Sequence, residues 1–336
     1  MSEPMATGRR PPGAEAPVTT RSDLHDLASK PIRPLARPGR WLATAAVAVL
    51  IVQFGYGLIF NKNYEWPRFL YWFAEDVIIS GLWVTLKVTG LSAVFGLVGG
   101  VLLAIARLSG SALLRGASWA YIWFFRSLPL IVLLLILYNL SYFYPELSVG
   151  VPFGPRFSSV QTVDLFTPLF IGVLALSLNE AAYAAEVVRG GILSVDAGQI
   201  EAANALGLSR ARQLRRVILP QALRSIVPAY VNQLISLIKS SSLVYYVSLI
   251  DLFGQVFVLE SRYPTDVVPL LLVGSAWYLI LTAILSILQF YVERFFARGA
   301  LRSLPPTPWQ KLRATVRRGR YNARGNRASV LDAGSR

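Results

Sequence analysis

Long apolar runs are the feature that most restricts what this chain of 336 residues can fold into. Six of them are long enough to be membrane-spanning helices, because about 20 apolar residues at roughly 1.5 Å per residue cross the hydrocarbon core of a bilayer. The predicted spans cover residues 41–60, 78–106, 128–144, 166–188, 226–250 and 267–292. The apolar segment 112–125 could continue the third span obliquely, and the fifth span could be broken in its middle.

The composition agrees with an all-α integral membrane protein. Hydrophobic residues make up 54% of the chain and charged residues 15%, against about a quarter charged in soluble globular proteins. The chain has no cysteine, which excludes disulfides and thiolate metal sites. Its one histidine, His25, precedes the first apolar run, so a histidine-based triad or zinc site inside the membrane is excluded as well.

The distribution of Lys and Arg predicts how the spans are oriented. Six spans place the N-terminal tail (1–40, basic and expected to be disordered) and the basic C-terminal tail (299–336) on one side. That side, with the connections after the second and fourth spans, holds 26 Lys and Arg residues against 4 on the other. Because basic residues concentrate in cytoplasmic segments, both termini are predicted to be cytoplasmic.

The net charge of +15 is therefore interpreted as a topology signal. Nucleic-acid binding is not expected, because the basic residues are not interleaved with aromatic stacking platforms. Tyr and Trp gather at the opposite edge of the spans, as aromatic residues do where a protein meets membrane lipid: Tyr64, Trp66, Tyr71, Trp72, Tyr142 and Tyr144.

The loop 190–224 between the fourth and fifth spans is too polar to cross a membrane and too patterned to be disordered. A helix that starts at a cap, Ser194 or Asp196, could end at Gly207, because glycine suits the left-handed residue that terminates helices. By itself, a cytoplasmic loop of this length is more typical of a basic hairpin at the membrane surface that holds two spans together.

A second short helix is expected after the turn, with Ser209 as its cap and Pro220 either interrupting it or starting the next element. The loop also contains Glu-Ala-Ala, then three residues, Gly, nine residues, a branched aliphatic residue, one residue and Leu-Pro. The residues at these positions are Glu201, Ala202, Ala203, Gly207, Val217, Leu219 and Pro220.

With this pattern the chain resembles the transmembrane subunits of polar amino-acid ABC importers, the histidine, glutamine and glutamate permease group. The family has Ile where this chain has Val217. Similarity extends to four further stretches: Gly81 to Arg107, Phe125-Arg126-Ser127-Leu128-Pro129-Leu130, Leu178 to Ile192, and Lys239-Ser240-Ser241-Ser242-Leu243. Together they cover about residues 81–298, while the first span and both tails lie outside the family's five-span core.

The resemblance implies a type I importer permease domain over residues 78–298, preceded by one extra span at 41–60, in the bacterial inner membrane. It further implies that the loop 190–224 couples to a cytoplasmic ATPase. The expected partners are two ATPase subunits, a second permease subunit (identical or homologous) and a periplasmic amino-acid-binding protein. No Gly-x-x-x-x-Gly-Lys-Ser/Thr occurs in the sequence, so ATP with Mg²⁺ would be used by the partner, and this chain is expected to be neither an enzyme nor a cofactor binder.

Polar residues inside the predicted spans are the candidates for a translocation path, because such residues normally face a bundle interior or a wet cavity. The candidates are Asn179, Glu180, Tyr183, Lys239 and Ser240. Interhelical hydrogen bonding is the alternative for each of them. For Glu186 this alternative is favoured, with Arg189 as the expected partner. For Gly96 and Gly100 the favoured interpretation is close packing of two helices.

Lys87 and Arg126 are expected to reach toward a membrane interface without a substrate role. Serines 240–242 could unwind the fifth span locally, and a broken helix is where many transporters hold substrate. Two other functions are less well supported by the residues. An ion-coupled secondary transporter would normally show internal repeats and several intramembrane acids, but the sequence has no extended repeat and few such acids. A membrane enzyme would need a nucleophile, base or metal cluster, for which a chain without cysteine and with His25 alone offers few residues.

Overall fold

The computed structural model describes residues 38–151 and 156–296, and it divides the chain into two units, 1–62 and 63–336. The predicted disordered tails, apart from residues 38–40, lie outside the described residues. Within the first unit, helix α2 (Pro38–Phe60) includes an apolar stretch, Leu42–Phe60, that is long enough to cross a membrane. Large apolar side chains are exposed all along it, as expected for a span that meets lipid.

The short turn η1 (Lys62–Tyr64) spans the boundary between the units, and the second unit continues with the aromatic helix α3 (Trp66–Phe73) and the 32-residue helix α4 (Asp76–Arg107). Helix α5 (Ala112–Ser127) and helix α6 (Leu130–Tyr138) meet at an angle of 98°. The bend falls at Pro129, because the residue before a proline is driven out of the helical region and Leu128 is accordingly extended.

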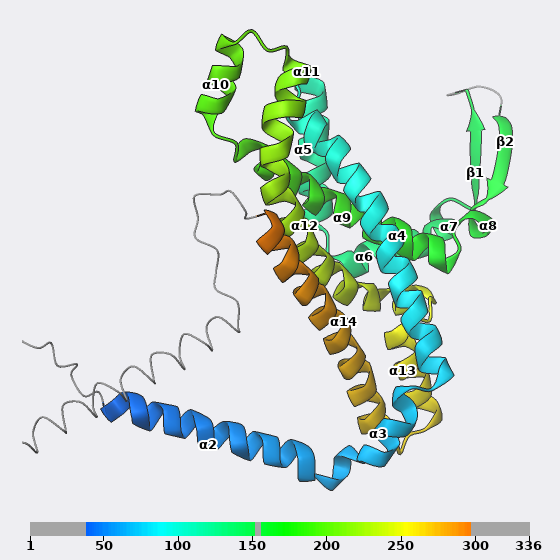
Figure 1. Cartoon of the computed structure of the whole chain (residues 1–336). Coiled ribbons are helices and arrows are strands. Elements are labelled where there is room, and N and C mark those ends of the chain that lie inside the picture. The colour runs from blue at the N-terminus through cyan, green and yellow to red at the C-terminus, as the bar shows by residue number, and fades with distance from the viewer. Residues whose placement is uncertain (1–37, 152–155, 297–336) are drawn as a thin grey trace, which may run out of the picture. The chain divides into compact units, whose positions relative to one another are not determined.

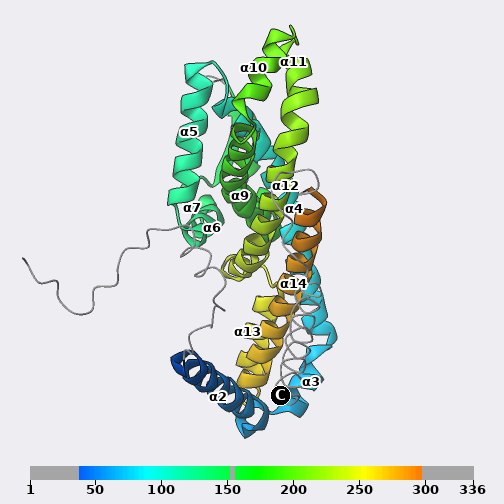
Figure 2. The ribbon, with the colours of Figure 1, turned by 60° about the vertical axis from the view of Figure 1, so that its left-hand side comes forward.

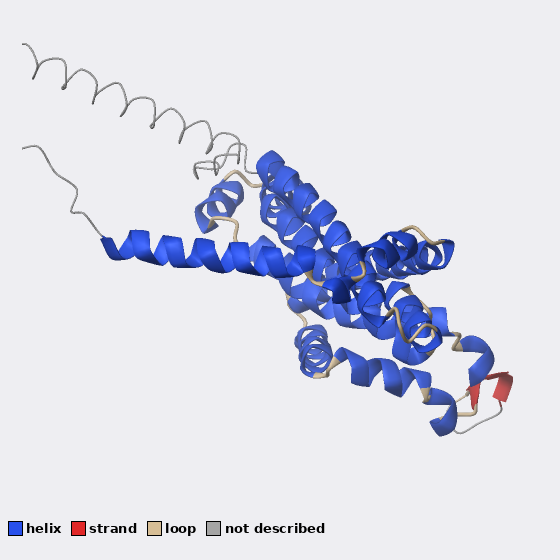
Figure 3. Ribbon diagram, turned by 90° about the horizontal axis from the view of Figure 1, so that it is seen from below, coloured by secondary structure: helices blue, strands red, loops and turns tan. Residues whose placement is uncertain are grey.

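A small β-hairpin separates the third span from the fourth. It follows α7 (Leu140–Phe143) and consists of β1 (Glu146–Gly150) and β2 (Arg156–Gln161), which pair antiparallel with Glu146 opposite Gln161 and an irregularity at Val149/Gly150. Helix α8 (Thr162–Leu165) follows. The strands are the red arrows in Figure 3, and the all-α prediction had not included them.

Helix α9 (Pro168–Leu193) packs along α4 through small residues. Ser92, Gly96, Gly100 and Ala104 recur every fourth position of α4 and are all buried. A Cβ atom at Gly100 would lie 2.5 Å from Ala184 Cβ, so glycine is what allows the two backbones to approach. The predicted packing role of Gly96 and Gly100 is therefore confirmed.

The loop after α9 contains α10 (Ala197–Ala205), α11 (Arg210–Gln213) and the π-helical turn η2 (Leu214–Ile218), which runs into α12 (Leu219–Ser240). The chain continues as the 3₁₀ helix η3 (Ser241–Val247), and α13 (Leu252–Arg262) then departs at 50°. The last described element is α14 (Val267–Phe296). In both Figure 1 and Figure 2, α10 and α11 lie at the opposite end of this unit from α3 and α13.

The break before α13 is organised by Asp251, which is fully buried. Its carboxylate accepts the Gly254 N–H at 2.9 Å as an N-cap, and it also accepts hydrogen bonds from Thr85 of α4 (3.2 Å) and Tyr278 of α14 (3.3 Å). One side chain thus joins three helices at the point where the fifth span is interrupted.

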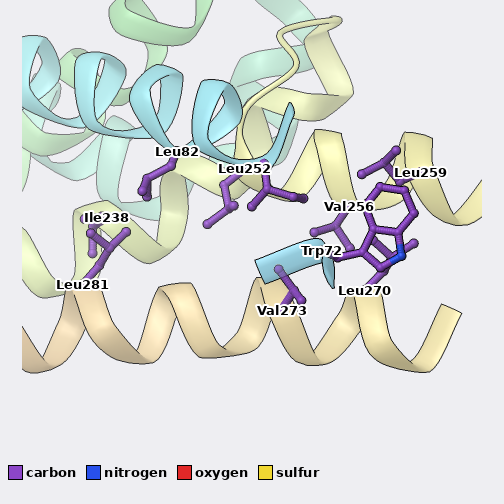
Figure 4. Close-up of a cluster of buried hydrophobic side chains, with 10 residues drawn as sticks. Trp72, Leu82, Ile238, Leu252, Val256, Leu259, Leu270, Val273 and Leu281 are labelled. Atoms are coloured by element: carbon purple, nitrogen blue, oxygen red, sulfur yellow. The ribbon is translucent and has the colours of Figure 1, made fainter. Parts of the chain in front are cut away.

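Two apolar clusters form most of the core. One gathers α3, α4, α12, α13 and α14 around Trp72, Leu252, Val256, Leu270 and Val273, as Figure 4 shows. The Trp72 indole N–H donates to Asp266 at 2.8 Å, and Arg68 lies 3.5 Å from the other carboxylate oxygen. The second cluster packs α6 and η3 against α4, α9 and α12.

The predicted spans correspond to these helices with two differences, in the third and the fifth. The bend in the fifth span falls at 248–251, at the end of the predicted 226–250 and not in its middle, and α13 beyond it was not predicted. Four described helices are long and apolar enough to cross a membrane, and the number rises to six if each bent pair is counted as one span. The longest helix within the third span, predicted as 128–144, is α6, which has only nine residues. It would need α5, the proposed oblique continuation, to cross about 30 Å.

Candidate functional site

The end of α5 is fixed to α9 by two hydrogen bonds beside the bend. The Asn179 amide donates to the Phe125 carbonyl at 3.0 Å, and the Tyr121 hydroxyl donates to the Leu178 carbonyl at 3.0 Å. Asn179, a predicted translocation residue, therefore satisfies a carbonyl that the break leaves without a helical partner.

A polar cavity of about 480 Å³, here named the inner cavity, opens beside this bend between α9 and α12. The α5–α6 break and α9 supply Arg126, Ser127, Asn179, Glu180 and Tyr183. The facing turns of α12 supply Gln233, Ser236 and Ser240. Of the five predicted translocation residues, the structure brings four together here, while Lys239 is exposed and does not line this cavity.

Glu180 is the carboxylate of the inner cavity. Its side chain is only 2% exposed, and its Cβ and Cγ lie against Gly96 of α4. Within the described residues, its Oε1 atom has no hydrogen-bond partner. The carboxylate interacts with the Gln233 side chain, but a buried carboxylate oxygen without a partner is energetically costly, which makes Glu180 a group in this cavity that could bind a ligand atom.

A second cavity of about 380 Å³ follows α9 toward the α10–α11 loop and is here named the loop-side cavity. It is lined by Arg107, Trp119, Trp123 and Glu186, and it shares Arg126, Ser127 and Tyr183 with the inner cavity. Glu186 is bound by Arg189, with nitrogen–oxygen distances of 2.7 and 3.0 Å. This confirms the pairing predicted for Glu186.

The turn between α10 and α11 has the predicted construction. Asp196 occupies the N-cap position of α10, and Gly207 has a φ of +69°, the left-handed conformation that suits glycine. The Gly207 and Leu208 N–H groups donate to the carbonyls of Asn204 and Ala203. Glu201 and Ala202 are exposed, whereas Ala203 is buried.

Gln213 joins the two short helices. Its side-chain amide nitrogen donates to Asn204 Oδ1 at 2.5 Å and to the Leu208 carbonyl at 2.9 Å, and the residue is 8% exposed. Because Asn204 belongs to α10 and Gln213 to α11, this side chain fixes the two helices relative to each other across the Gly207 turn.

The remaining loop residues lie where the loop joins α12. Val217 belongs to the π-helical turn η2, and Leu219 and Pro220 form the first turn of α12. Pro220 has no N–H to donate to the preceding turn, and the wider π turn lies directly before it. The loop is anchored on the spans by a cluster around Ala104, Val188, Val195, Ala222 and Ile226.

Three residues that shape the site or its supporting helices were not predicted. Arg126 was assigned to the interface without a site role, although it lines both cavities. Gln213 gives no sequence signal beyond a polar residue in a polar loop. Asp251 could have been found as an N-cap, because it follows an apolar run and directly precedes Leu252-Phe253-Gly254.

Among the described residues, no group of three His, Asp or Glu could hold a metal.

Long apolar helices, two bent helix pairs and a polar cavity between them define a membrane transport permease. The sequence matches, over residues 96–298, the family described as binding-protein-dependent transport system inner membrane component. The match covers more than half of the chain, and this chain belongs to that family.

Individual relatives agree. The arginine transport system permease protein ArgU of Corynebacterium glutamicum is 38% identical over 280 residues, which cover 82% of this chain and 86% of that protein. The glutamate/aspartate import permease protein GltK of Escherichia coli is 35% identical over 217 residues, or 65% of this chain and 92% of that one.

Solved structures give the same result. A crystal structure of an amino acid ABC transporter with histidines matches with a TM-score of 0.56 and 33% identity, over 65% of this chain and 93% of that one. The MetNI methionine ABC transporter in an inward facing conformation matches with a TM-score of 0.52 and 25% identity. The expected family and its helical fold are thereby confirmed, and the chain is the transmembrane subunit of an ABC importer.

Proposed function

We propose that this chain forms the path by which a polar amino acid crosses the bacterial inner membrane. The observation that carries this proposal is the inner cavity, which is lined by polar side chains and lies inside a bundle of membrane-spanning helices. Its volume of about 480 Å³ falls in the range of small-molecule sites. The matched permeases are named for arginine and for glutamate/aspartate, which supports this substrate class.

Within the cavity, Glu180 is the proposed partner of a positively charged substrate group, such as an α-ammonium. A charge-assisted hydrogen bond would satisfy its free oxygen and offset the cost of its burial. Tyr183 and Ser240 border the same space. Lys239 is proposed to act beside this site, at the exposed side of α12, and Asn179 to maintain the cavity wall through its bond to Phe125.

The loop α10–α11 is the proposed docking element for a separate ATPase, through Glu201, Ala202, Ala203, Gly207, Val217, Leu219 and Pro220. Two ATPase subunits, a second permease subunit and a periplasmic binding protein would complete the importer. Both termini would then be cytoplasmic, in agreement with the excess of basic residues on that side. A stiff helix pair suits this role, since it can transmit a partner's motion as a rigid body.

Docking is tested by pull-down of the ATPase with the tagged permease. Gly207→Pro should abolish recovery, because proline fixes φ near −65° whereas the turn has +69°. Gly190→Ala, with open space around its Cα, is the matched control and should retain the ATPase. If no ATPase is recovered with the unaltered chain, and the purified protein moves amino acids down an ion gradient, a secondary transporter replaces this proposal.

The substrate role of Glu180 is tested by uptake of radiolabelled arginine, glutamine and glutamate into vesicles that contain the whole importer. For the amino acid that is carried, Glu180→Gln should raise the KM by about tenfold or more, the loss expected for a charge-assisted hydrogen bond of about 1.5–3 kcal/mol. Glu293→Gln, an exposed position of α14, is the control. Unchanged uptake in Glu180→Gln would eliminate this residue as a substrate contact.

A further inference from the structure

The inner cavity and the loop-side cavity meet at the same three residues, Arg126, Ser127 and Tyr183. Asn179 and Tyr183 border the first cavity, and Tyr183 and Glu186 border the second. These residues follow one another at i, i+4 and i+7 along α9, so they lie on one face of the helix. The two cavities therefore adjoin along one face of α9, and Tyr183 lies where they meet.

Arg126 lies over Tyr183, where the two cavities meet. The central carbon of its guanidinium lies 5.2 Å from the centre of the Tyr183 ring, on its face. Its neighbour Phe125 is held to α9 by Asn179, so the backbone beside Arg126 is fixed. The side chain itself is exposed and forms no ion pair with any described residue.

The acid nearest to Arg126 in the loop-side cavity is paired with another cation. Glu186 lines this cavity together with Arg126, and its Oε2 atom accepts both hydrogen bonds from Arg189, at 2.7 and 3.0 Å. Among the described residues, only a cation–π contact with Tyr183 is found for the Arg126 guanidinium, an interaction that costs little to break. A charge pair with Glu186 would add a second contact to the cation–π contact on the guanidinium, although water screens the pair at this exposed position.

We propose that Arg126 and Tyr183 form a gate between the two cavities, and that Arg189 keeps this gate openable by competing with Arg126 for Glu186. This proposal rests on the proposed transport path and adds to it the point at which the path is closed. In the closed state the guanidinium covers Tyr183. In the open state it rotates away, while the anchored backbone of α5 stays in place.

The gate is tested by thiol labelling, which requires neither a known substrate nor transport. The chain contains no native cysteine, so Ser240→Cys introduces a single thiol that lines the inner cavity alone. Inverted membrane vesicles that contain the full complex, without ATP, are treated with membrane-impermeant methanethiosulfonates, one cationic and one anionic. Trp119→Cys, in the loop-side cavity, reports access that does not depend on the gate.

Removal of the ring by Tyr183→Leu should accelerate labelling of the Ser240→Cys thiol about fivefold, the factor that corresponds to roughly 1 kcal/mol of cation–π interaction. Tyr183→Phe keeps the ring face and should leave the rate unchanged. Both reagents should respond alike, because the charge of Arg126 is retained. If Tyr183→Leu does not accumulate in the membrane, the labelling rates of Arg126→Gln, which removes the cation, and Arg126→Lys, which keeps it, are compared in the same way. Equal rates in the two members of either pair overturn the proposal.

The role of the ion pair is tested by releasing Glu186. With Arg189→Gln, the Ser240→Cys thiol should be labelled more slowly than in the chain with native Arg189, because the freed Glu186 can bind Arg126 and hold the gate closed. The double variant Arg189→Gln/Glu186→Gln should restore the rate, and Arg189→Lys should not change it. If Arg189 had only a structural role, the second substitution would not restore the labelling rate. Persistent slow labelling in the double variant, or no slowing in Arg189→Gln, would refute this part of the mechanism.

Discussion

Gly96 of α4 lies directly against Glu180 of α9: a Cβ atom at position 96 would fall 2.7 Å from Glu180 Cβ and 2.6 Å from its Cγ. The backbone of one helix thereby forms the wall behind the buried carboxylate of the other. Close helix packing and the position of a candidate substrate group are thus consequences of the same glycine.

Gly96→Ala should therefore destabilise the protein and disturb the inner cavity together. The added methyl group must displace Glu180 or separate the helices, at an expected cost of about 1–3 kcal/mol for overpacking. Thermal unfolding of the purified permease measures the loss. Gly90→Ala, on the same helix with nothing within 4 Å, is the matched control and should be neutral or slightly stabilising. Equal melting temperatures for both variants would contradict the packing argument.

Gln213→Leu should weaken retention of the ATPase without affecting the spans. The substitution leaves Asn204 Oδ1 and the Leu208 carbonyl without the donor that now satisfies both, and so loosens α10 relative to α11 by about 1–3 kcal/mol. The fraction of ATPase recovered with the tagged permease is the measurement. Gln221→Leu, a half-buried position on α12, serves as control. Undiminished recovery in Gln213→Leu would show that the turn needs no side-chain bridge.

Asp251→Ala and Asp251→Asn should differ, although both remove the charge. Alanine removes the N-cap of α13 and leaves Thr85 and Tyr278 without their acceptor, with an expected loss of about 2–4 kcal/mol. Asparagine keeps an oxygen for the Gly254 N–H and is itself a favourable N-cap, so its loss should be the smaller. Protease resistance of the purified protein distinguishes them. Identical losses would mean that the charge of Asp251, and not its capping geometry, holds the break.

Trp72→Phe should destabilise the α3 end of the protein more than Arg68→Gln, although both residues contact Asp266. The indole N–H donates to a carboxylate that is 1% exposed, and its loss should cost about 1–3 kcal/mol. Arg68 is 54% exposed and 3.5 Å away, and an ion pair of this kind contributes at most about 1 kcal/mol. Thermal unfolding of the two variants gives the order, and the reverse order would be inconsistent with this assignment.

The sequence allowed the helical fold and the loop to be predicted because their causes are local. Apolar length determines a span, and Asp196, Gly207 and Pro220 mark helix ends by their own backbone preferences. The serines after Lys239 likewise coincide with the change from α12 to the 3₁₀ helix η3. These features do not depend on which distant residue lies opposite.

The cavities and the hairpin could not be predicted in the same way, since they arise from contacts between remote segments. Nothing near position 126 indicates that α9 will place Tyr183 beneath the guanidinium, and nothing near position 180 indicates that Gly96 will form the wall behind its side chain. The hairpin was missed because β1 and β2 are short and only partly apolar. Their pairing, rather than a strong strand pattern, creates them.

The π-helical turn η2 allows the junction between the loop and α12 to tolerate a change of length. A π turn closes i→i+5 hydrogen bonds and holds one residue more than an α turn, so deleting one residue from Leu214–Ile218 would leave a regular α-helix, and α10 and α11 would keep roughly their direction relative to the spans. A deletion inside the regular helix α12 would instead rotate them by about 100°, and the docking surface would face a different direction although every one of its side chains was unchanged. Changes of length on the way into the fifth span are therefore expected at η2 and not within α12.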